Sequence, residues 1–134
     1  MDLRQIRFKG YDVNGSSLEI HDDSKGGKFK VSFADNLVNT MSDEDGNLMY
    51  IDVNPIVTGY DSEAENEDTP IFEVKTSLTL TFECEFKEEV PQDFYLANTW
   101  YFESYIYIAT KLSIENILRD TVLEDIILPW SPPL

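Results

Sequence analysis

The side chains with the most reactive chemistry are scarce in this 134-residue chain. His21 is its one histidine and Cys84 its one cysteine, so no zinc site of histidines and cysteines can be assembled. His21 stands in the turn-like stretch IHDDSKGGK, where a surface residue is expected. Cys84 falls on the apolar phase of a strand pattern, where a small buried thiol is expected. A Ser–His or Cys–His nucleophile is therefore not predicted.

Carboxylates are abundant, but their spacing matches no known site. Residues 43–46 (DEDG) resemble part of a calcium loop, yet with Gly46 at the sixth position the first ligand position falls on Met41 and the twelfth on Asp52. We interpret this stretch as a turn. The 26 acidic residues offer many carboxylate pairs for acid–base work, and nothing singles one pair out. The sequence also lacks GxxxxGK[ST] and GxGxxG phosphate loops. We predict a protein that is not an enzyme and uses no metal or cofactor. The alternative hypothesis of a small hydrolase or small-molecule binding protein is supported by the number of carboxylates alone.

The net charge of −16 argues against two classes of partner. A strongly negative surface repels phosphate backbones and anionic lipid head groups, so we expect neither nucleic-acid binding nor membrane insertion. An apolar fraction of 42% is sufficient for a folded core, and the length fits a single domain over residues 1–134. No apolar run approaches about 18 residues, and residues 1–10 (MDLRQIRFKG) lack the apolar core of a signal peptide. We expect a cytoplasmic protein.

Four segments carry the alternation of a strand. The clearest is EVKTSLTLTFECEFK at 73–87, in which apolar and polar residues alternate throughout. Shorter runs stand at 5–10 (QIRFKG), 28–35 (KFKVSFAD) and 48–60 (LMYIDVNPIVTGY). Residues that tolerate positive φ, expected to form turns, stand at Asn14–Gly15, Gly26–Gly27 and Asp45–Gly46. The acidic stretch 61–68 (DSEAENED) is either a solvated loop or an acidic docking segment.

A helical period begins at about Asn98 or Thr99, either of which can cap a helix, and continues to Asp120. Its first three turns are apolar over most of their circumference, so the helix needs cover from the sheet on one side and from another layer on the other. We predict that this layer is a second copy of the chain, contacted by one stripe: Tyr101, Tyr105, Ile108 and Leu112. Alternatively, the tyrosines lie half exposed over the chain's own sheet.

The elements are predicted to form an α+β domain. Four strands precede one long C-terminal helix without βαβ alternation, which favours a four-stranded antiparallel sheet. The chain then ends in LEDIILPWSPPL, where Pro129, Pro132 and Pro133 favour an extended conformation. We expect Ile126, Ile127 and Leu128 to pack back on the fold.

The order and spacing of these segments carry a family resemblance. TWYFESYIYIATKL, the break RDT and VLEDIILPWSPP are similar to a helix, a polar break and a Leu-Pro segment of the SecB family of protein-export chaperones and its short Gram-positive relatives. PIFEVKTSLTLTFE is similar to that family's fourth strand, and MYIDVNPIVTGY and FKVSFAD fall where its third and second strands do. Two departures are Phe102, where the family has a proline, and the end of the sequence at Leu134, where its second helix would follow.

The resemblance implies that non-native polypeptide is held on apolar grooves by a homodimer or homotetramer without nucleotide or metal. It implies a link to protein export, although some relatives work in a toxin–antitoxin pathway. The candidate polypeptide-binding residues lie at the edges of elements: Phe33, Leu37, Val38, Trp130 and Leu134. Trp130 fits a core position equally well. We expect Trp130 and Leu134 either to cover exposed apolar surface as a lid or to form part of that surface.

The resemblance also implies partner docking on the outer sheet face, at Glu73 and Asp12. Ordinary solvated acids explain both residues as well. The competing hypothesis is an adaptor that binds one folded partner through an acidic face.

Overall fold

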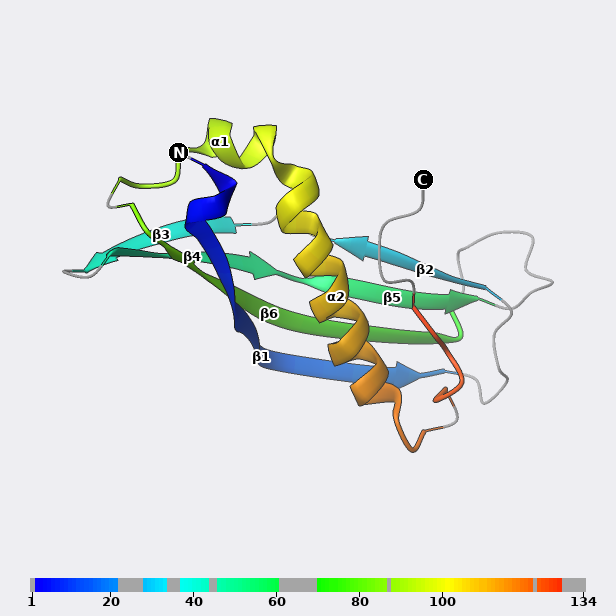
Figure 1. The fold of residues 1–134 in the computed structure, drawn as a ribbon. Coiled ribbons are helices and arrows are strands. Elements are labelled where there is room, and N and C mark those ends of the chain that lie inside the picture. Colours follow the sequence, from blue (N-terminus) through cyan, green and yellow to red (C-terminus); the bar gives the residue numbers. More distant parts are fainter. Residues whose placement is uncertain are drawn as a thin grey trace.

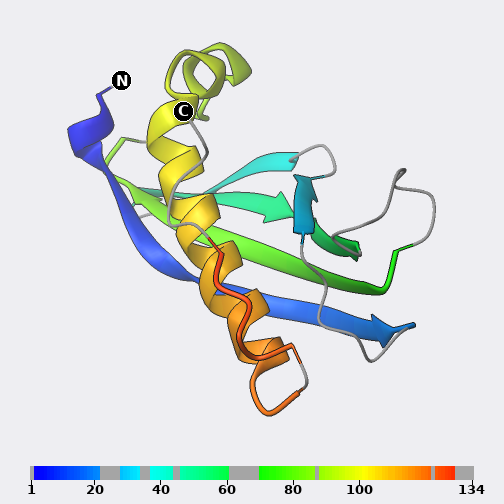
Figure 2. The same ribbon diagram turned by 90° about the vertical axis from the view of Figure 1, so that its right-hand side faces the viewer.

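One long helix crosses one face of an antiparallel sheet in the computed structural model (Figures 1 and 2). The structure describes residues 2–21, 28–33, 37–43, 46–60, 70–86, 88–121 and 123–128, and for residues 28, 37–43 and 46 it describes the backbone alone. Within these ranges no helix combines the length and the apolar character of a membrane span. The elements are η1 (Leu3–Gln5), β1 (Ile6–Ile20), β2 (Lys28–Phe33), β3 (Leu37–Asp43), β4 (Gly46–Val53), β5 (Pro55–Tyr60), β6 (Phe72–Cys84), α1 (Gln92–Ala97) and α2 (Thr99–Leu118).

The α+β class and the antiparallel sheet are confirmed, but the predicted number of four strands is wrong. The described residues form a six-stranded sheet in which β6 pairs with β1 on one side and with both β4 and β5 on the other. One predicted strand is divided at Asn54, because the following Pro55 has no N–H to donate. Its two halves keep one register on β6, with Val53 opposite Leu78 and Ile56 opposite Lys75. β2 and β3 pair with β5 and β4 at the far edge.

Strand β1 continues through Asn14–Gly15, so the turn predicted there is wrong. The register against β6 shifts between Phe8 and Gly10 and again between Val13 and Gly15, which marks two bulges. Gly10 has φ 138°, a conformation that favours glycine. Each extra residue moves the alternation by one position, and the apolar side chains thereby stay on the helix-covered face.

Helix α2 confirms the predicted helix, although its start differs in detail. Asn98 makes no side-chain capping bond to α2; its Nδ2 instead donates to the Phe94 carbonyl oxygen at 2.9 Å. That contact closes α1, a short helix after Pro91 that the sequence pattern did not predict. The two helices meet at Asn98.

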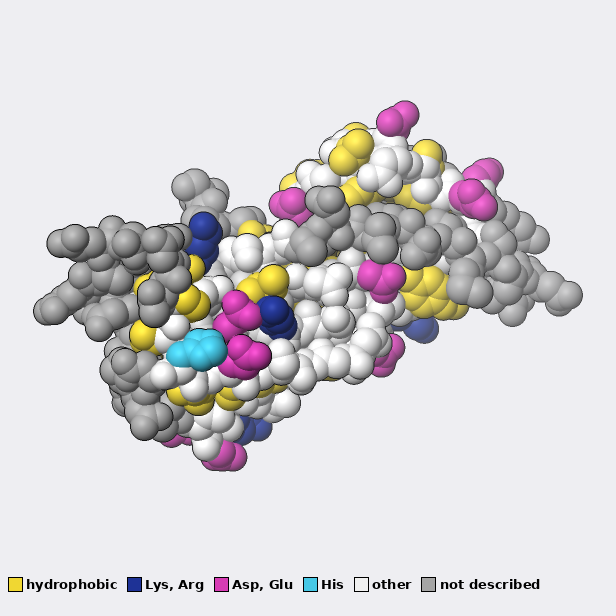
Figure 3. All heavy atoms as spheres, turned by 180° about the vertical axis from the view of Figure 1, so that it is seen from behind, with side chains coloured by type: hydrophobic (Ala, Val, Ile, Leu, Met, Phe, Trp, Pro, Cys, Tyr) yellow, Lys and Arg dark blue, Asp and Glu magenta, His cyan; other side chains and the backbone are white. Residues whose placement is uncertain are grey.

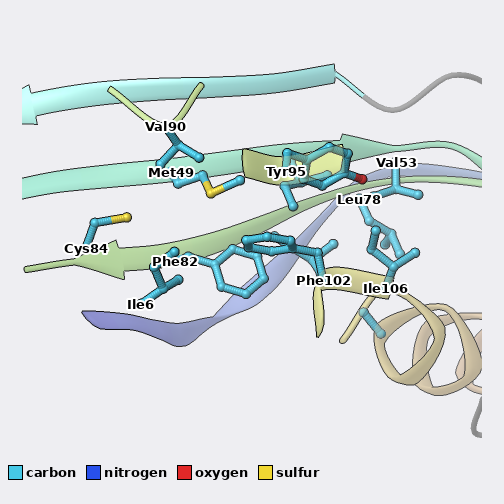
Figure 4. Packing of buried hydrophobic residues seen from close by; sticks show 13 residues of the cluster. Ile6, Met49, Val53, Leu78, Phe82, Cys84, Val90, Tyr95, Phe102 and Ile106 are labelled. Atoms are coloured by element: carbon cyan, nitrogen blue, oxygen red, sulfur yellow. The ribbon is translucent and has the colours of Figure 1, made fainter. Parts of the chain in front are cut away.

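Two apolar clusters fill the space between α2 and the sheet. In the larger one Phe82 of β6 meets Phe102 of α2 edge to face, with ring centroids 5.3 Å apart (Figure 4). Cys84 lies in the same cluster, and its burial is confirmed. The smaller cluster joins the end of α2 to β5, β6 and the C-terminal segment, and its buried members are Val57, Ile71, Phe72, Val74, Ile114, Leu118, Leu123 and Leu128.

The segment 123–128 turns back along α2, as predicted. The Lys111 ammonium on α2 is buried and donates to the Leu128 carbonyl oxygen at 2.8 Å, while Glu115 Oε1 lies 3.1 Å away. Leu128 is buried and Ile126 half buried, but Ile127 is 72% exposed, so the expectation for Ile127 is wrong. Residues 129–134, with Trp130 and Leu134, lie outside the described residues.

Candidate functional site

A groove of about 430 Å³ runs between α2 and β1, which we call the α2–β1 groove. Val13 and Leu112 are its most exposed apolar side chains, at 50% and 43%. Tyr11 and Ile117 are half buried beside them. The remaining lining is polar, from Ser16, Ser113, Asn116 and Arg119. The groove therefore offers apolar contact area with a polar rim.

Strand β1 gives this groove a second property. It pairs with β6 over its whole length, and within the described residues it pairs with no other strand. Its outer edge thus carries backbone donors and acceptors that another extended chain can meet. An apolar groove beside such an edge can bind a peptide by strand addition, with alternate side chains of the peptide entering the groove.

The predicted oligomer stripe on α2 lies towards β1. Tyr105 stacks on Phe8 with ring centroids 4.5 Å apart, and the Tyr101 hydroxyl donates to the Ile6 carbonyl oxygen at 3.0 Å. These tyrosines thus pack partly on their own sheet, the alternative that the sequence left open. Ile108 is half buried and Leu112 lines the groove. Contact with a second copy stays a prediction for the stripe.

The setting of Tyr101 predicts a pH effect on stability. Burial, with a further contribution from the Tyr105 hydrogen bond, raises the pKa of Tyr101 from 10.0 to about 12. Because the folded state favours the neutral phenol, this contribution is fully present below about pH 10 and is lost as pH rises through about 12. We expect Tyr101→Phe to flatten the alkaline fall of the urea midpoint over that range. Equal slopes for both proteins would contradict this assignment.

The five predicted polypeptide-binding residues are not brought together by the described structure. Phe33 is half buried on the other side of α2, with its ring centroid 5.3 Å from that of Tyr107. Burial, and the nearby charge of Glu103, raise the pKa of Tyr107. Leu37 and Val38 belong to β3, opposite Asp52 and Ile51. Trp130 and Leu134 fall outside the described residues.

The two predicted docking acids share the sheet face that α2 leaves uncovered, because Asp12 lies opposite Thr79 and Glu73 has the same phase as Thr79 on β6. Figure 3 shows this face of the molecule. Asp12 is exposed and pairs with Thr79, whereas Glu73 lies six residues earlier on β6, roughly 20 Å along the sheet. Glu73 Oε1 lies 3.1 Å from the Lys75 ammonium. The acids therefore lie on one face but form no common cluster, and their docking role stays a prediction.

Other side chains of this polar face bond to one another across three strands. Asn14 Nδ2 donates to Thr79 Oγ1 at 2.7 Å, and Thr79 Oγ1 donates to Asp52 Oδ1 at 2.8 Å. Hydrogen bonds from Arg7 and Lys9 lower the pKa of Glu83. A shallow hollow of about 360 Å³ lies near the middle of the sheet, lined by Gly15, Ser16, Ser17, Asn54, Pro55, Ile56, Lys75, Thr76 and Ser77. This face can present polar and charged contacts to a folded partner.

The reactive side chains stand apart from the groove. Burial raises the pKa of Cys84, which keeps the thiol protonated. His21 is exposed, 3.6 Å from a Glu19 carboxylate oxygen. In the ranges that the structure describes, no three His, Cys, Asp or Glu residues lie together as a metal site would require.

Sequence reasoning named Leu112 alone among the groove residues and missed its three other apolar members: Tyr11, Val13 and Ile117. The alternation of Tyr11 and Val13 is visible in YDVNGSS, but the following Asn14–Gly15 reads as a turn and hides the strand. Ile117 continues the apolar side of the helix beyond Leu112. Knowledge of the two bulges in β1 would have shown that these residues lie on one surface.

A six-stranded antiparallel sheet with one long helix across one face defines a SecB-like α+β fold. The solved structures that this chain resembles include the Mycobacterium tuberculosis SecB-like chaperone Rv1957 in complex with a ChAD peptide from the HigA1 antitoxin Rv1956. The TM-score is 0.66 at 7% identity, over 94% of this chain and 89% of the mycobacterial chain. No family model matches the sequence, and no curated protein matches it. The likeness therefore establishes the fold.

Proposed function

We propose that the protein is a SecB-like polypeptide-binding protein, a holdase that works without ATP and holds non-native chains in the α2–β1 groove. The observation that carries the proposal is the pair of exposed apolar side chains, Val13 and Leu112, beside the edge of β1 that pairs with no other described strand. The solved chaperone with the same fold supports it, because that protein is bound to a peptide. A role in protein export is the finer part of the proposal and rests on the sequence resemblance alone.

Burial of apolar side chains supplies the affinity in such a groove. Apolar area contributes about 25 cal/mol per Å², and this contribution depends little on the exact side chain. Hydrogen bonds to the edge of β1 involve backbone groups and are equally independent of sequence. The net charge of −16 favours client segments rich in Lys and Arg. Broad selectivity for unfolded chains follows.

An aggregation assay with a denatured client tests the proposal. Replacing Val13 or Leu112 with serine removes about 1 kcal/mol of apolar burial, so we expect roughly fivefold weaker client binding from each variant. Ile127→Ser is the matched control, since Ile127 is 72% exposed and does not line the groove. No suppression of aggregation by the wild type, or equal suppression by all variants, would refute the proposal. Trp130→Ala tests in the same assay whether the C-terminal end contributes.

The same proposal includes a cytoplasmic homodimer or homotetramer assembled through the stripe of Tyr101, Tyr105, Ile108 and Leu112. Leu112 belongs to both the stripe and the groove, so assembly and client binding compete for it. Sedimentation at several protein concentrations tests assembly, and Ile108→Ser is expected to shift the protein towards monomer. An unchanged monomer at all concentrations would remove this part of the proposal.

The second candidate is an adaptor that binds one folded partner through the polar sheet face. It is favoured by the ordered bonds across that face, with Asp12 and Glu73 as the proposed docking acids. Binding of this kind weakens strongly with salt, whereas groove binding does not. A single partner whose capture fails at high salt supports the adaptor, and capture of many unfolded chains with little salt dependence supports the holdase.

A further inference from the structure

A second exposed apolar surface lies where α1 meets α2. Leu96 is 59% exposed and Trp100 is 66% exposed, and we call this pair the elbow patch. Trp100 precedes Leu112 by 12 residues on α2, which places it roughly 18 Å along the helix from the α2–β1 groove. The elbow patch is therefore separate from the groove of the proposed function.

The elbow patch is supported from behind by buried side chains. Tyr95 and Phe102 on its two helices are buried in the core, 6% and 0% exposed, with ring centroids 5.3 Å apart. Asn98 joins the helices, because it donates to the Phe94 and Tyr95 carbonyl oxygens of α1 while its own carbonyl oxygen accepts from the Tyr101 N–H of α2. The Tyr101 hydroxyl donates to the Ile6 carbonyl oxygen of β1. The exposed tryptophan thus stands on a well-packed corner, and tryptophan is among the residues that contribute most to binding when a partner buries them.

The helix turns that carry the elbow patch contain acids and no bases. Helix α1 contains Asp93, and α2 contains Glu103 in the stretch 99–110, which has no Lys or Arg. Asp93 stands three residues before Leu96, and Glu103 three residues after Trp100, so each acid lies beside an apolar member on its helix. In Figure 3 hydrophobic side chains on the α1 lobe have acidic side chains around them.

We propose that the elbow patch docks a Lys- and Arg-rich amphipathic segment of a partner protein. An apolar side chain of that segment packs on Leu96 and Trp100, and its cations meet Asp93 and Glu103. Lysine and arginine also bind the face of an indole ring, so Trp100 can receive both kinds of side chain. A second copy of this chain does not fit, because a symmetric contact would bring the same acids face to face.

Binding of a defined peptide tests this docking surface. The probe is a short, fluorescein-labelled, helix-forming peptide with Leu and Lys on one face, and the control peptide has Glu in place of each Lys. We expect the lysine peptide to bind, and Trp100→Ala to weaken it at least about 30-fold. Asp93→Asn with Glu103→Gln is expected to weaken it roughly threefold to tenfold. In a Trp130→Phe background Trp100 is the one remaining tryptophan, and its emission is expected to shift to shorter wavelength on binding.

Leu112→Ser separates this surface from the groove. That variant is expected to bind the lysine peptide like the wild type even where its client binding falls, and Trp100→Ala is expected to keep client binding. The proposal is overturned if the glutamate peptide binds equally well, or if Trp100→Ala binds the lysine peptide like the wild type. Concentration-dependent dimers that Trp100→Ala abolishes would also overturn it, in favour of a second copy.

Discussion

Replacing Phe82 with alanine is expected to lower the free energy of unfolding by about 3–5 kcal/mol. Phe82 is fully buried, and its ring contacts those of Phe8, Phe102 and Tyr105 at centroid distances of 5.3, 5.3 and 5.7 Å. The deletion leaves a cavity where β1, β6 and α2 meet. Because domains of this size are stable by about 5–15 kcal/mol, this is a large part of the total.

Urea unfolding followed by far-ultraviolet circular dichroism measures this loss. Leu96→Ala is the control, since Leu96 is 59% exposed and its removal should change the free energy of unfolding by less than about 0.5 kcal/mol. A Phe82→Ala protein as stable as the Leu96→Ala protein would show that α2 does not pack on β6 through this ring.

Replacing Gly59 with alanine is expected to cost about 3 kcal/mol or more, at the upper end of overpacking effects. A Cβ atom on Gly59 would lie 1.8 Å from Cε1 of Phe72, and two other atoms of that ring lie within 2.4 Å. The Phe72 ring is 1% exposed and surrounded by the smaller apolar cluster, so it cannot turn away without displacing its neighbours.

Two further proteins make this prediction specific. Gly15→Ala adds the same methyl group on β1 with nothing within 4 Å, and we expect little change in its urea midpoint. Phe72→Leu replaces the ring with a smaller side chain and so relieves the clash. We expect the double variant Gly59→Ala with Phe72→Leu to be more stable than the sum of the two single losses predicts. Equal midpoints for Gly59→Ala and Gly15→Ala would contradict the close approach of β5 and β6 at this point.

The regular elements of this protein follow from local patterns. The strict alternation of 73–86 specifies β6 because one of its faces is buried and the other is polar. The 3.6-residue period from Tyr101 onwards specifies α2 in the same way. Burial of Cys84 follows from its phase on β6. These positions need no knowledge of the neighbouring elements.

The irregular elements could not be predicted from local sequence patterns. Strand β1 keeps its apolar side chains on one face only because bulges at Lys9 and Asn14 each add one residue, and this depends on its pairing with β6. The short helix α1 contains Leu96 exposed and Tyr95 buried, a pattern decided by the packing of Tyr95 on Phe102. Val13 lies between the two bulges, so the groove that it lines could not be predicted from the sequence pattern either.

Site-specific photo-crosslinking is the most direct test of the central claim that the α2–β1 groove holds non-native polypeptide. A benzophenone amino acid at position 112 places the reactive group in the groove, and one at position 75 places it on the exposed polar face. With reduced, carboxamidomethylated lysozyme as the probe, an unfolded chain of net positive charge, we expect strong crosslinking from position 112 and little from position 75. Equal crosslinking from both positions, or none from position 112, would contradict the claim.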